Sequence, residues 1–229
     1  MKTENKSDGP DWDGIVKALE KWRKNLQDDE NSPSVTTVAE HYQRDPWSVL
    51  VSTILSLRTK DEVTLAASQR LLKKAKTPRA LLALGEEETA KLAYPAGFYR
   101  TKAASLTKIA AILIEQYGGK VPADMDELLA LPGVGRKTAN LVLIEAFDMD
   151  GICVDVHVHR ICNRARWIET STPEETEMEL RRILPKKHWK GINALLVLYG
   201  QRLCRPTSPY CSRCVITGHC QRRGVEKSR

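Results

Sequence analysis

The residues best suited to chemistry lie in a glycine turn and in a short segment that follows it. The turn is Leu131-Pro-Gly-Val-Gly-Arg-Lys137-Thr-Ala-Asn140, and Asp155 stands eighteen residues after Lys137. A lysine amine that has lost its proton can attack an electrophilic carbon and form a Schiff base. The positive end of the helix expected after the turn favours that neutral amine. A lysine with a carboxylate downstream is therefore typical of amine chemistry on a sugar carbon.

Helical patterns flank this turn, over about 124–131 and 136–147. Glycine permits the backbone angles that such a tight connection needs, and Asp124 is placed to cap the first helix. The amides at the start of the second helix should point outward and attract an anion such as a DNA phosphate. The sequence thus predicts a helix-hairpin-helix whose DNA contacts come from Gly133, Val134, Gly135 and Arg136.

Four cysteines near the C-terminus have the spacing of metal ligands: Cys204, Cys211, Cys214 and Cys220. The loop that carries them is rich in Arg, Pro and Ser, and it has too little apolar material to order itself without a metal. Iron-sulfur and zinc both stay open, because Cys-x-x-Cys also occurs in zinc sites and the gaps match neither common ferredoxin pattern. Disulfides are disfavoured, since the chain opens on Met1 without a signal peptide.

Together these residues resemble the endonuclease III family of DNA glycosylases, in the helix-hairpin-helix superfamily. The resemblance covers about Pro46 to Cys220 and is carried by the hairpin at 131–140, the Val-Asp-Val-His-Val-His-Arg segment at 154–160 and the Cys-x6-Cys-x2-Cys-x5-Cys loop. It implies that Lys137 is the nucleophile, that Asp155 is the essential carboxylate and that the cysteines hold a 4Fe-4S cluster. It also implies a bifunctional glycosylase and AP lyase of base excision repair. Such an enzyme removes oxidised pyrimidines and cleaves 3′ to the abasic site by β-elimination.

Apolar residues recur at helical spacing through most of the chain, which predicts an all-α fold. The resemblance implies two lobes: a six-helix barrel over 39–149, and a discontinuous domain formed by 11–38 and 150–229 with the cluster loop at 204–220. Because Lys137 and Asp155 fall on opposite sides of this boundary, the active site is expected in a cleft between the lobes. Residues 1–10 are polar and contain Gly9-Pro10, so they are predicted to be disordered.

One departure from the family pattern concerns the residue that fills the hole left by an extruded base. Family members often carry glutamine there, whereas this chain has Arg58. A guanidinium can stack and donate hydrogen bonds in the gap, so the filling role can persist with a changed preference for the opposite base. His157 is expected to orient the active-site segment or a phosphate. Four aromatic residues are expected to be mainly core or hinge residues: Trp47, Tyr94, Phe98 and Tyr99.

Alternative functions differ in their need for Lys137 and Asp155. Adenine glycosylases of this fold usually carry a small polar residue in place of Lys137 and a glutamate near Thr53, and this chain has no glutamate there. A G:T or G:U mismatch glycosylase stays open because of Arg58. A non-catalytic iron-sulfur redox sensor that binds DNA has no use for the paired lysine and carboxylate. From the residues alone, Asp155 also fits a helix cap.

The charge of the chain is unevenly distributed. The 229 residues have a net charge of +7, and residues 151–229 hold 15 Lys and Arg against 7 Asp and Glu. Such a surplus fits contacts with DNA phosphates, although it equally fits a soluble basic surface. No stretch reaches the eighteen apolar residues of a membrane span. We expect a monomer that binds duplex DNA with a damaged base or an abasic site in a prokaryotic cytoplasm, associated with the nucleoid.

Overall fold

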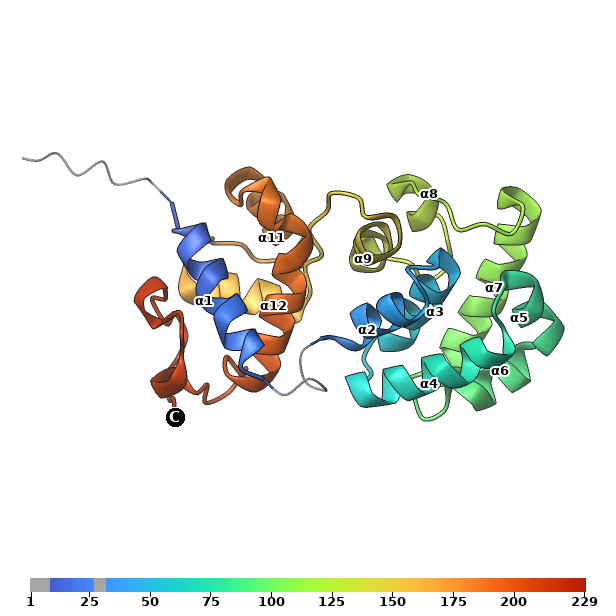
Figure 1. The fold of residues 1–229 in the computed structure, drawn as a ribbon, viewed down its shortest axis with the longest axis horizontal. Helices are drawn as coiled ribbons and strands as arrows, with labels where there is room; N and C mark the ends of the chain where they lie inside the picture. The colour runs from blue at the N-terminus through green and yellow to red at the C-terminus, as the bar shows by residue number, and fades with distance from the viewer. Residues whose placement is uncertain (1–8, 27–31) are drawn as a thin grey trace, which may run out of the picture. The chain divides into compact units, whose positions relative to one another are not determined.

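The computed structural model describes residues 9–26 and 32–229, so the predicted disorder of 1–10 falls mostly on residues outside these ranges. Within the described ranges every regular element is helical, which confirms the predicted all-α fold (Figure 1). None of the described helices is long and apolar enough to cross a membrane. The α-helices are α1 Trp12–Lys24, α2 Ser34–His41, α3 Pro46–Ser56, α4 Asp61–Lys74, α5 Pro78–Leu84, α6 Glu86–Ala93, α7 Tyr99–Tyr117, α8 Met125–Leu129, α9 Arg136–Phe147, α10 Val156–Ala165, α11 Pro173–Ile183 and α12 Trp189–Arg202.

Packing divides the chain into two compact units, one formed by Ser32–Cys153 and the other by Met1–Asn31 with Val154–Arg229. In the Ser32–Cys153 unit, helix α3 is buried at every position from Trp47 to Leu55 and contacts α2, α4, α7 and α9 (Figure 1). A helix that is apolar on all sides belongs in a core. Helix α7 lies against α5 and α6 and fills the same core with Leu106, Ile109 and Leu113.

Local capping explains where the helix before the hairpin begins. The Asp124 carboxylate accepts hydrogen bonds from the amides of Asp126 at 2.9 Å and Glu127 at 3.1 Å. This is the predicted cap, and it satisfies amides that have no partner inside the helix. The start of α8, and with it the entry to the hairpin, is thereby fixed.

Helix α2 was not predicted from the sequence. Its N-cap is Pro33, which has no side-chain group to accept a hydrogen bond, and its eight residues include the β-branched Val35 and Val38. Such residues have low helix propensity. The helix forms because Val35, Val38 and Ala39 are buried against α3 and α4. Tertiary burial therefore outweighs local preference in this segment.

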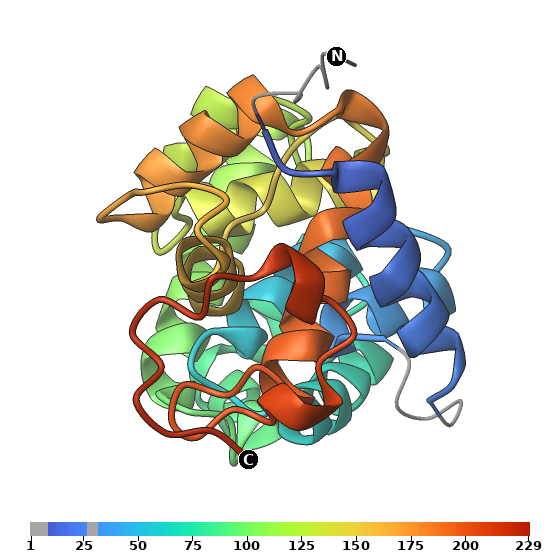
Figure 2. The ribbon, with the colours of Figure 1, turned by 90° about the vertical axis from the view of Figure 1, so that its left-hand side faces the viewer.

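The second unit joins the N-terminal helix to the C-terminal part of the chain. Helix α1 packs along α12 (Figure 2). The Trp12 ring meets Trp167 edge to face with centroids 5.2 Å apart, and Trp22 meets Tyr199 in the same way at 4.9 Å. Large aromatic side chains bury much apolar surface, and edge-to-face pairs add further stabilisation. These two contacts help to hold α1 against the rest of its unit.

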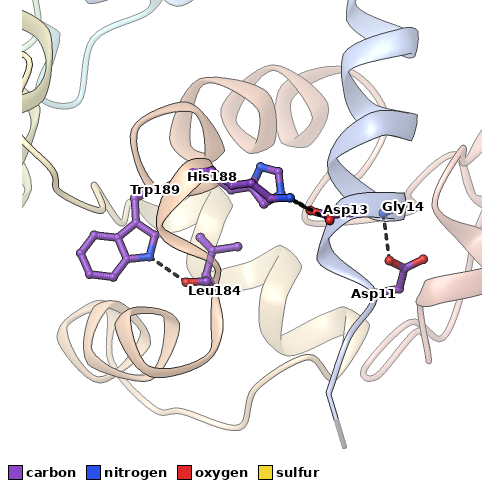
Figure 3. A network of polar contacts seen from close by, with 7 residues as sticks. Asp11, Asp13, Gly14, Leu184, His188 and Trp189 are labelled. Carbon is purple, nitrogen blue, oxygen red and sulfur yellow. Dashed lines mark hydrogen bonds and ion pairs between the residues drawn. The ribbon is translucent and has the colours of Figure 1, made fainter. Parts of the chain in front are cut away.

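An ionic contact supplements them at the start of α1 (Figure 3). The Asp13 carboxylate accepts hydrogen bonds from Lys187 Nζ at 2.8 Å and His188 Nε2 at 2.7 Å. The hydrogen bond from Lys187, followed by the one from His188, lowers the pKa of Asp13. Because Asp13 is exposed, solvent screens this contact, and its contribution to stability is small.

Candidate active site and cysteine loop

The glycine turn stands between α8 and α9, in the Ser32–Cys153 unit. Gly133 has a φ of +80°, a left-handed conformation that favours glycine. Helix α9 begins at Arg136, so the half-buried Lys137 lies in its first turn. The N-cap is Gly135, which has no side chain to occupy the first amides of the helix. The start of α9 thus combines a positive helix end with a partly exposed lysine.

Val134 does not fit the predicted role of a residue with a free amide. Its amide donates to the Leu131 carbonyl at 3.1 Å, and its side chain is 7% exposed. The bond closes the turn, and the side chain joins the core of the unit. The prediction of outward-pointing amides from Gly133 to Arg136 is therefore wrong for Val134, which serves as an apolar anchor of the hairpin.

The residues that follow Lys137 hold its backbone in place. Thr138, Ala139 and Asn140 are buried, and α9 packs against α3. The Cys153 thiol also lies 3.6 Å from the Lys137 carbonyl as a hydrogen-bond donor. Lys137 consequently stands half-buried at the start of a helix whose next residues are fixed in the core.

Asp155 is the N-cap of α10, in the other unit. Its Oδ1 accepts hydrogen bonds from the amides of His157 at 2.8 Å and Val158 at 2.9 Å, and the residue is 8% exposed. The cap interpretation is thus confirmed. Both bonds use Oδ1, so the second carboxylate oxygen, Oδ2, is not needed for the cap. The cap fixes the orientation of the carboxylate and leaves one oxygen for chemistry.

Arg160 supports His157 and was missed by the sequence analysis. One guanidinium nitrogen, Nη2, lies 3.1 Å from His157 Nδ1 and donates to the carbonyls of Gly200 at 3.2 Å and Cys204 at 2.8 Å. A Cβ on Gly200 would lie 2.5 Å from His157 Nδ1, so only glycine leaves room for this arrangement. The available signal was the spacing, since Arg160 follows His157 by three residues on one helical face.

The four cysteines of the loop line one small cavity of about 20 Å³, together with Arg164 and Tyr199. Three groups donate hydrogen bonds to their sulfurs: Arg164 Nη1 to Cys204 at 3.3 Å, the Tyr199 hydroxyl to Cys214 at 3.1 Å and the Arg222 amide to Cys220 at 3.4 Å. Donors of this kind suit thiolates, which carry the negative charge that metal ligation needs.

The spacing of these thiols bears on what they can hold. Within the described ranges, no three His, Cys, Asp or Glu side chains are grouped so that they could hold a metal ion. A single zinc ion with bonds of about 2.3 Å would draw its four sulfurs to within roughly 4 Å of one another. Burial raises the pKa of Cys204 and Cys220, and the hydrogen bond from Arg164 opposes this at Cys204. The thiols therefore surround a cavity and do not meet at a point.

Arg58 and Phe98 form an exposed pair in the Ser32–Cys153 unit. Arg58 lies in the turn between α3 and α4, and its guanidinium carbon is 5.6 Å from the centroid of the Phe98 ring. Phe98 is 63% exposed, and Tyr94 is 61% exposed. The expectation of a core role is thus wrong for these two aromatics. It is confirmed for Trp47, which is buried and donates to the Ala75 carbonyl at 3.0 Å.

Comparison with known proteins shows which family the chain belongs to. Residues 51–186 match the model of the HhH-GPD superfamily base excision DNA repair proteins. Over 187 residues the chain is 47% identical to endonuclease III of Thermotoga maritima, which covers 80% of this chain and 88% of that protein. The chain belongs to the endonuclease III family. This membership confirms the predicted class, a DNA glycosylase and AP lyase of base excision repair.

Two further members of the endonuclease III family extend the comparison. The chain is 47% identical to endonuclease III homolog 2, chloroplastic, of Arabidopsis thaliana over 75% of its own length, but it spans only 47% of that longer protein. It also superposes with a TM-score of 0.74 on a trapped endonuclease III–DNA covalent intermediate in an estranged-adenine complex. The two share 31% identity, and the match covers 89% of this chain and 96% of the other. That solved structure is, by its description, an endonuclease III bound covalently to DNA.

The close approach at Gly200 generates a testable prediction. Gly200→Ala should push His157 and Arg160 away from their present positions and lower stability by about 1–3 kcal/mol, the usual cost of overpacking. It should also weaken binding to a duplex with an abasic site. Thermal unfolding and a binding titration would measure the two effects.

The matched control is Gly191→Ala on the same helix, where a Cβ would have no neighbour within 4 Å. This control should unfold at the same temperature or higher, because alanine stabilises a helix by up to about 1 kcal/mol relative to glycine. Equal behaviour of the two variants would show that the space beside His157 is unimportant.

Proposed function

We propose that this enzyme removes oxidised pyrimidines from duplex DNA, with Lys137 as the nucleophile and Asp155 as the carboxylate that assists it. The observation that carries the proposal is the placement of Lys137, which stands partly exposed in the first turn of α9, directly before the buried stretch from Thr138 to Ile144. A nucleophile held on a rigid element needs little reorganisation before attack. The start of α9 beside it suits the phosphate of a bound strand.

The chemistry follows from the amine and the carboxylate. A base inside a duplex hides its sugar, so the damaged nucleotide must first leave the stack, at a cost of a few kcal/mol. The neutral amine of Lys137 attacks C1′, the glycosidic bond breaks and the base departs. Asp155 stabilises the positive charge that develops on the sugar and assists the proton transfers. The C1′–O4′ bond of the sugar then opens as O4′ takes up a proton, and the lysine nitrogen forms a Schiff base with C1′. The Schiff base acidifies the C2′ proton, and loss of that proton breaks the C3′–O bond and expels the 3′ phosphate by β-elimination.

DNA contacts are assigned to residues that the structure leaves at the surface. Gly133, Gly135 and Arg136 stand at the positive start of α9 and suit a phosphate. Arg58 and Phe98 are exposed beside each other and suit the gap left by the extruded base, because an aromatic ring and a guanidinium both stack on bases. His157 is assigned to a phosphate contact, held by Arg160.

We further propose that Cys204, Cys211, Cys214 and Cys220 hold a 4Fe-4S cluster. The four thiols line one cavity, and hydrogen bonds are donated to three of the sulfurs, which supports a single metal centre held by all four cysteines. A four-iron cluster is bound by four cysteine thiolates. When bound, it would tie the loop into one structure and supply a redox-active centre. The two packing units would then correspond to the barrel domain and the cluster domain of the sequence prediction.

The lysine assignment is tested by borohydride reduction on a duplex with one abasic site. The protein should become covalently trapped and should nick the strand, whereas Lys137→Ala should bind the duplex without trapping, because no other amine takes its place. Lys108→Ala removes an exposed lysine of α7 and should trap normally. Trapping by Lys137→Ala at the normal rate would overturn the assignment.

Release of the base decides the substrate class. The protein should excise thymine glycol from a duplex and leave the thymine of an undamaged G:T duplex in place. The reverse ranking would instead identify a mismatch glycosylase, the function that Arg58 leaves open.

Substitutions of Asp155 separate the cap from the chemistry. Asp155→Asn should keep the cap and the melting temperature, because asparagine and aspartate are equally good N-cap residues. It should nevertheless lower base excision by about 100-fold or more, in the range of lost general acid–base catalysis. Asp155→Ala should lose both the N-cap and base excision. Loss of the cap should lower the free energy of unfolding by about 1 kcal/mol. If Asp155→Asn excises bases at the full rate, the residue is only a cap.

The cluster assignment predicts a definite metal content. Purified protein should contain about four irons and matching sulfide per chain. Cys214→Ala should lose them, and Cys162→Ala should retain them, since Cys162 is buried away from the loop and burial raises the pKa of its thiol. One zinc per chain, or full iron in Cys214→Ala, would contradict the proposal.

A further inference from the structure

A lysine with no part in the proposed chemistry is buried beside the turn that carries Arg58. Lys102, in the first turn of α7, is 6% exposed. Its ammonium donates hydrogen bonds to the Leu55 carbonyl at 2.7 Å, the Leu57 carbonyl at 2.6 Å and Thr59 Oγ1 at 2.8 Å. All three acceptors are neutral oxygens, and burial lowers the pKa of Lys102 to about 8. Burying a cation costs free energy, so other interactions must offset that cost.

Two of the acceptors, the Leu55 and Leu57 carbonyls, lie at the end of α3, and Thr59 lies in the turn that follows. The last carbonyls of a helix have no partner inside it, and that end of the helix carries partial negative charge. Helix α3 ends at Ser56, with Leu57 as its C-cap. The ammonium of Lys102 therefore acts as a cap supplied by another helix. Its charge meets the negative end of α3, which offsets part of the cost of burial.

The capped turn is the one that presents Arg58. Leu57 and Thr59, both bonded to Lys102, flank Arg58 on either side. Arg58 has a φ of +52°, a left-handed conformation that is unfavourable for a residue with a side chain. Contacts on both sides of such a residue are what keep it there.

The same contacts reach the loop that presents Phe98. Thr59 Oγ1, besides accepting from Lys102, accepts from the Gly97 amide at 3.0 Å. A Cβ on Gly97 would lie 2.5 Å from the Arg58 carbonyl, so the two loops touch through their backbones. Phe98 follows directly and is also left-handed, with a φ of +55°. One ammonium thus ties two strained loops together at their junction.

We propose that Lys102 is a positioning residue that holds Arg58 and Phe98 as one rigid pair for insertion into the DNA stack. The inference rests on the proposed function, in which this pair occupies the gap left by the extruded base. Lys102 itself does not touch DNA. Without it, Arg58 is free to relax to a right-handed conformation, and the pair must be ordered again each time it enters a duplex, which lowers affinity.

The test is selective binding by Lys102→Met, a variant of similar length without the charge. Binding to a duplex with an abasic site opposite 2-aminopurine should weaken about tenfold, and binding to the undamaged duplex should hardly change. The fluorescence of 2-aminopurine, which reports whether the gap is filled, should shift toward that of the free abasic duplex. Lys108→Met is the matched control, because it removes an exposed charge from the same helix and should preserve the ratio of the two affinities.

A double-mutant cycle with Arg58→Ala decides whether Lys102 acts through the pair. Arg58→Ala should itself lose selectivity, and adding Lys102→Met to it should lower selectivity less than twofold further, since residues that act together are not additive. Full additivity, or an equal loss on both duplexes, would show that Lys102 is only a stabilising core residue. Normal selectivity in Arg58→Ala overturns the gap-filling role as well, so the two failures are distinguishable.

A second variant covers the case in which Lys102→Met does not fold. Thr59→Val keeps the shape of the side chain but removes the hydroxyl that joins Lys102 to Gly97. It should lower selectivity for the abasic duplex in the same direction and by a smaller factor, with circular dichroism confirming a folded protein. Unchanged selectivity in Thr59→Val would overturn the proposal.

Discussion

An α-helix leaves its first amides and its last carbonyls without partners inside the helix, and this constraint governs where the functional residues of the chain lie. Lys137 is in the first turn of α9, and Asp155 is the N-cap of α10. Arg58 follows the end of α3, and Phe98 is the N-cap of α7. In an all-helical chain the helix ends are where backbone polar groups still need partners. Phosphates and unpaired bases can therefore bind to these backbone groups at the helix ends.

Two of these helix ends are secured by a side chain whose contacts also serve the proposed site. Asp155 closes the start of α10 through one oxygen, which orients the other. Lys102 closes the end of α3 and, through Thr59, the loop before Phe98. In both cases folding supplies the order that binding would otherwise have to supply. The entropy cost is met once, in the native state, and the site needs less reorganisation when DNA arrives.

Local features of the fold could be predicted from the sequence, and long-range features could not. Helix α9 spans the predicted 136–147 and α8 lies within the predicted 124–131, because the cap and periodicity signals lie within each segment. Helix α2 was missed because burial against other helices, and no cap or strong propensity, stabilises it. The role of Lys102 was equally invisible, since its acceptors lie 43 to 47 residues earlier in the chain. The exposure of Phe98 depends on the same distant contact between loops.

The replacement of an amide by a guanidinium at Arg58 has a consequence for the base left unpaired. A glutamine both donates and accepts, so it can adapt to the mixed edge of any base. A guanidinium only donates. Within the proposed site, Arg58 therefore gains most from bases whose exposed edges offer acceptors, such as the O6 of guanine. Because Arg58 is anchored against Phe98 and its turn is fixed at Leu57 and Thr59, the guanidinium has little freedom to turn toward other atoms. The preference for the opposite base thus depends on the conformation of the turn that carries Arg58 as much as on Arg58 itself.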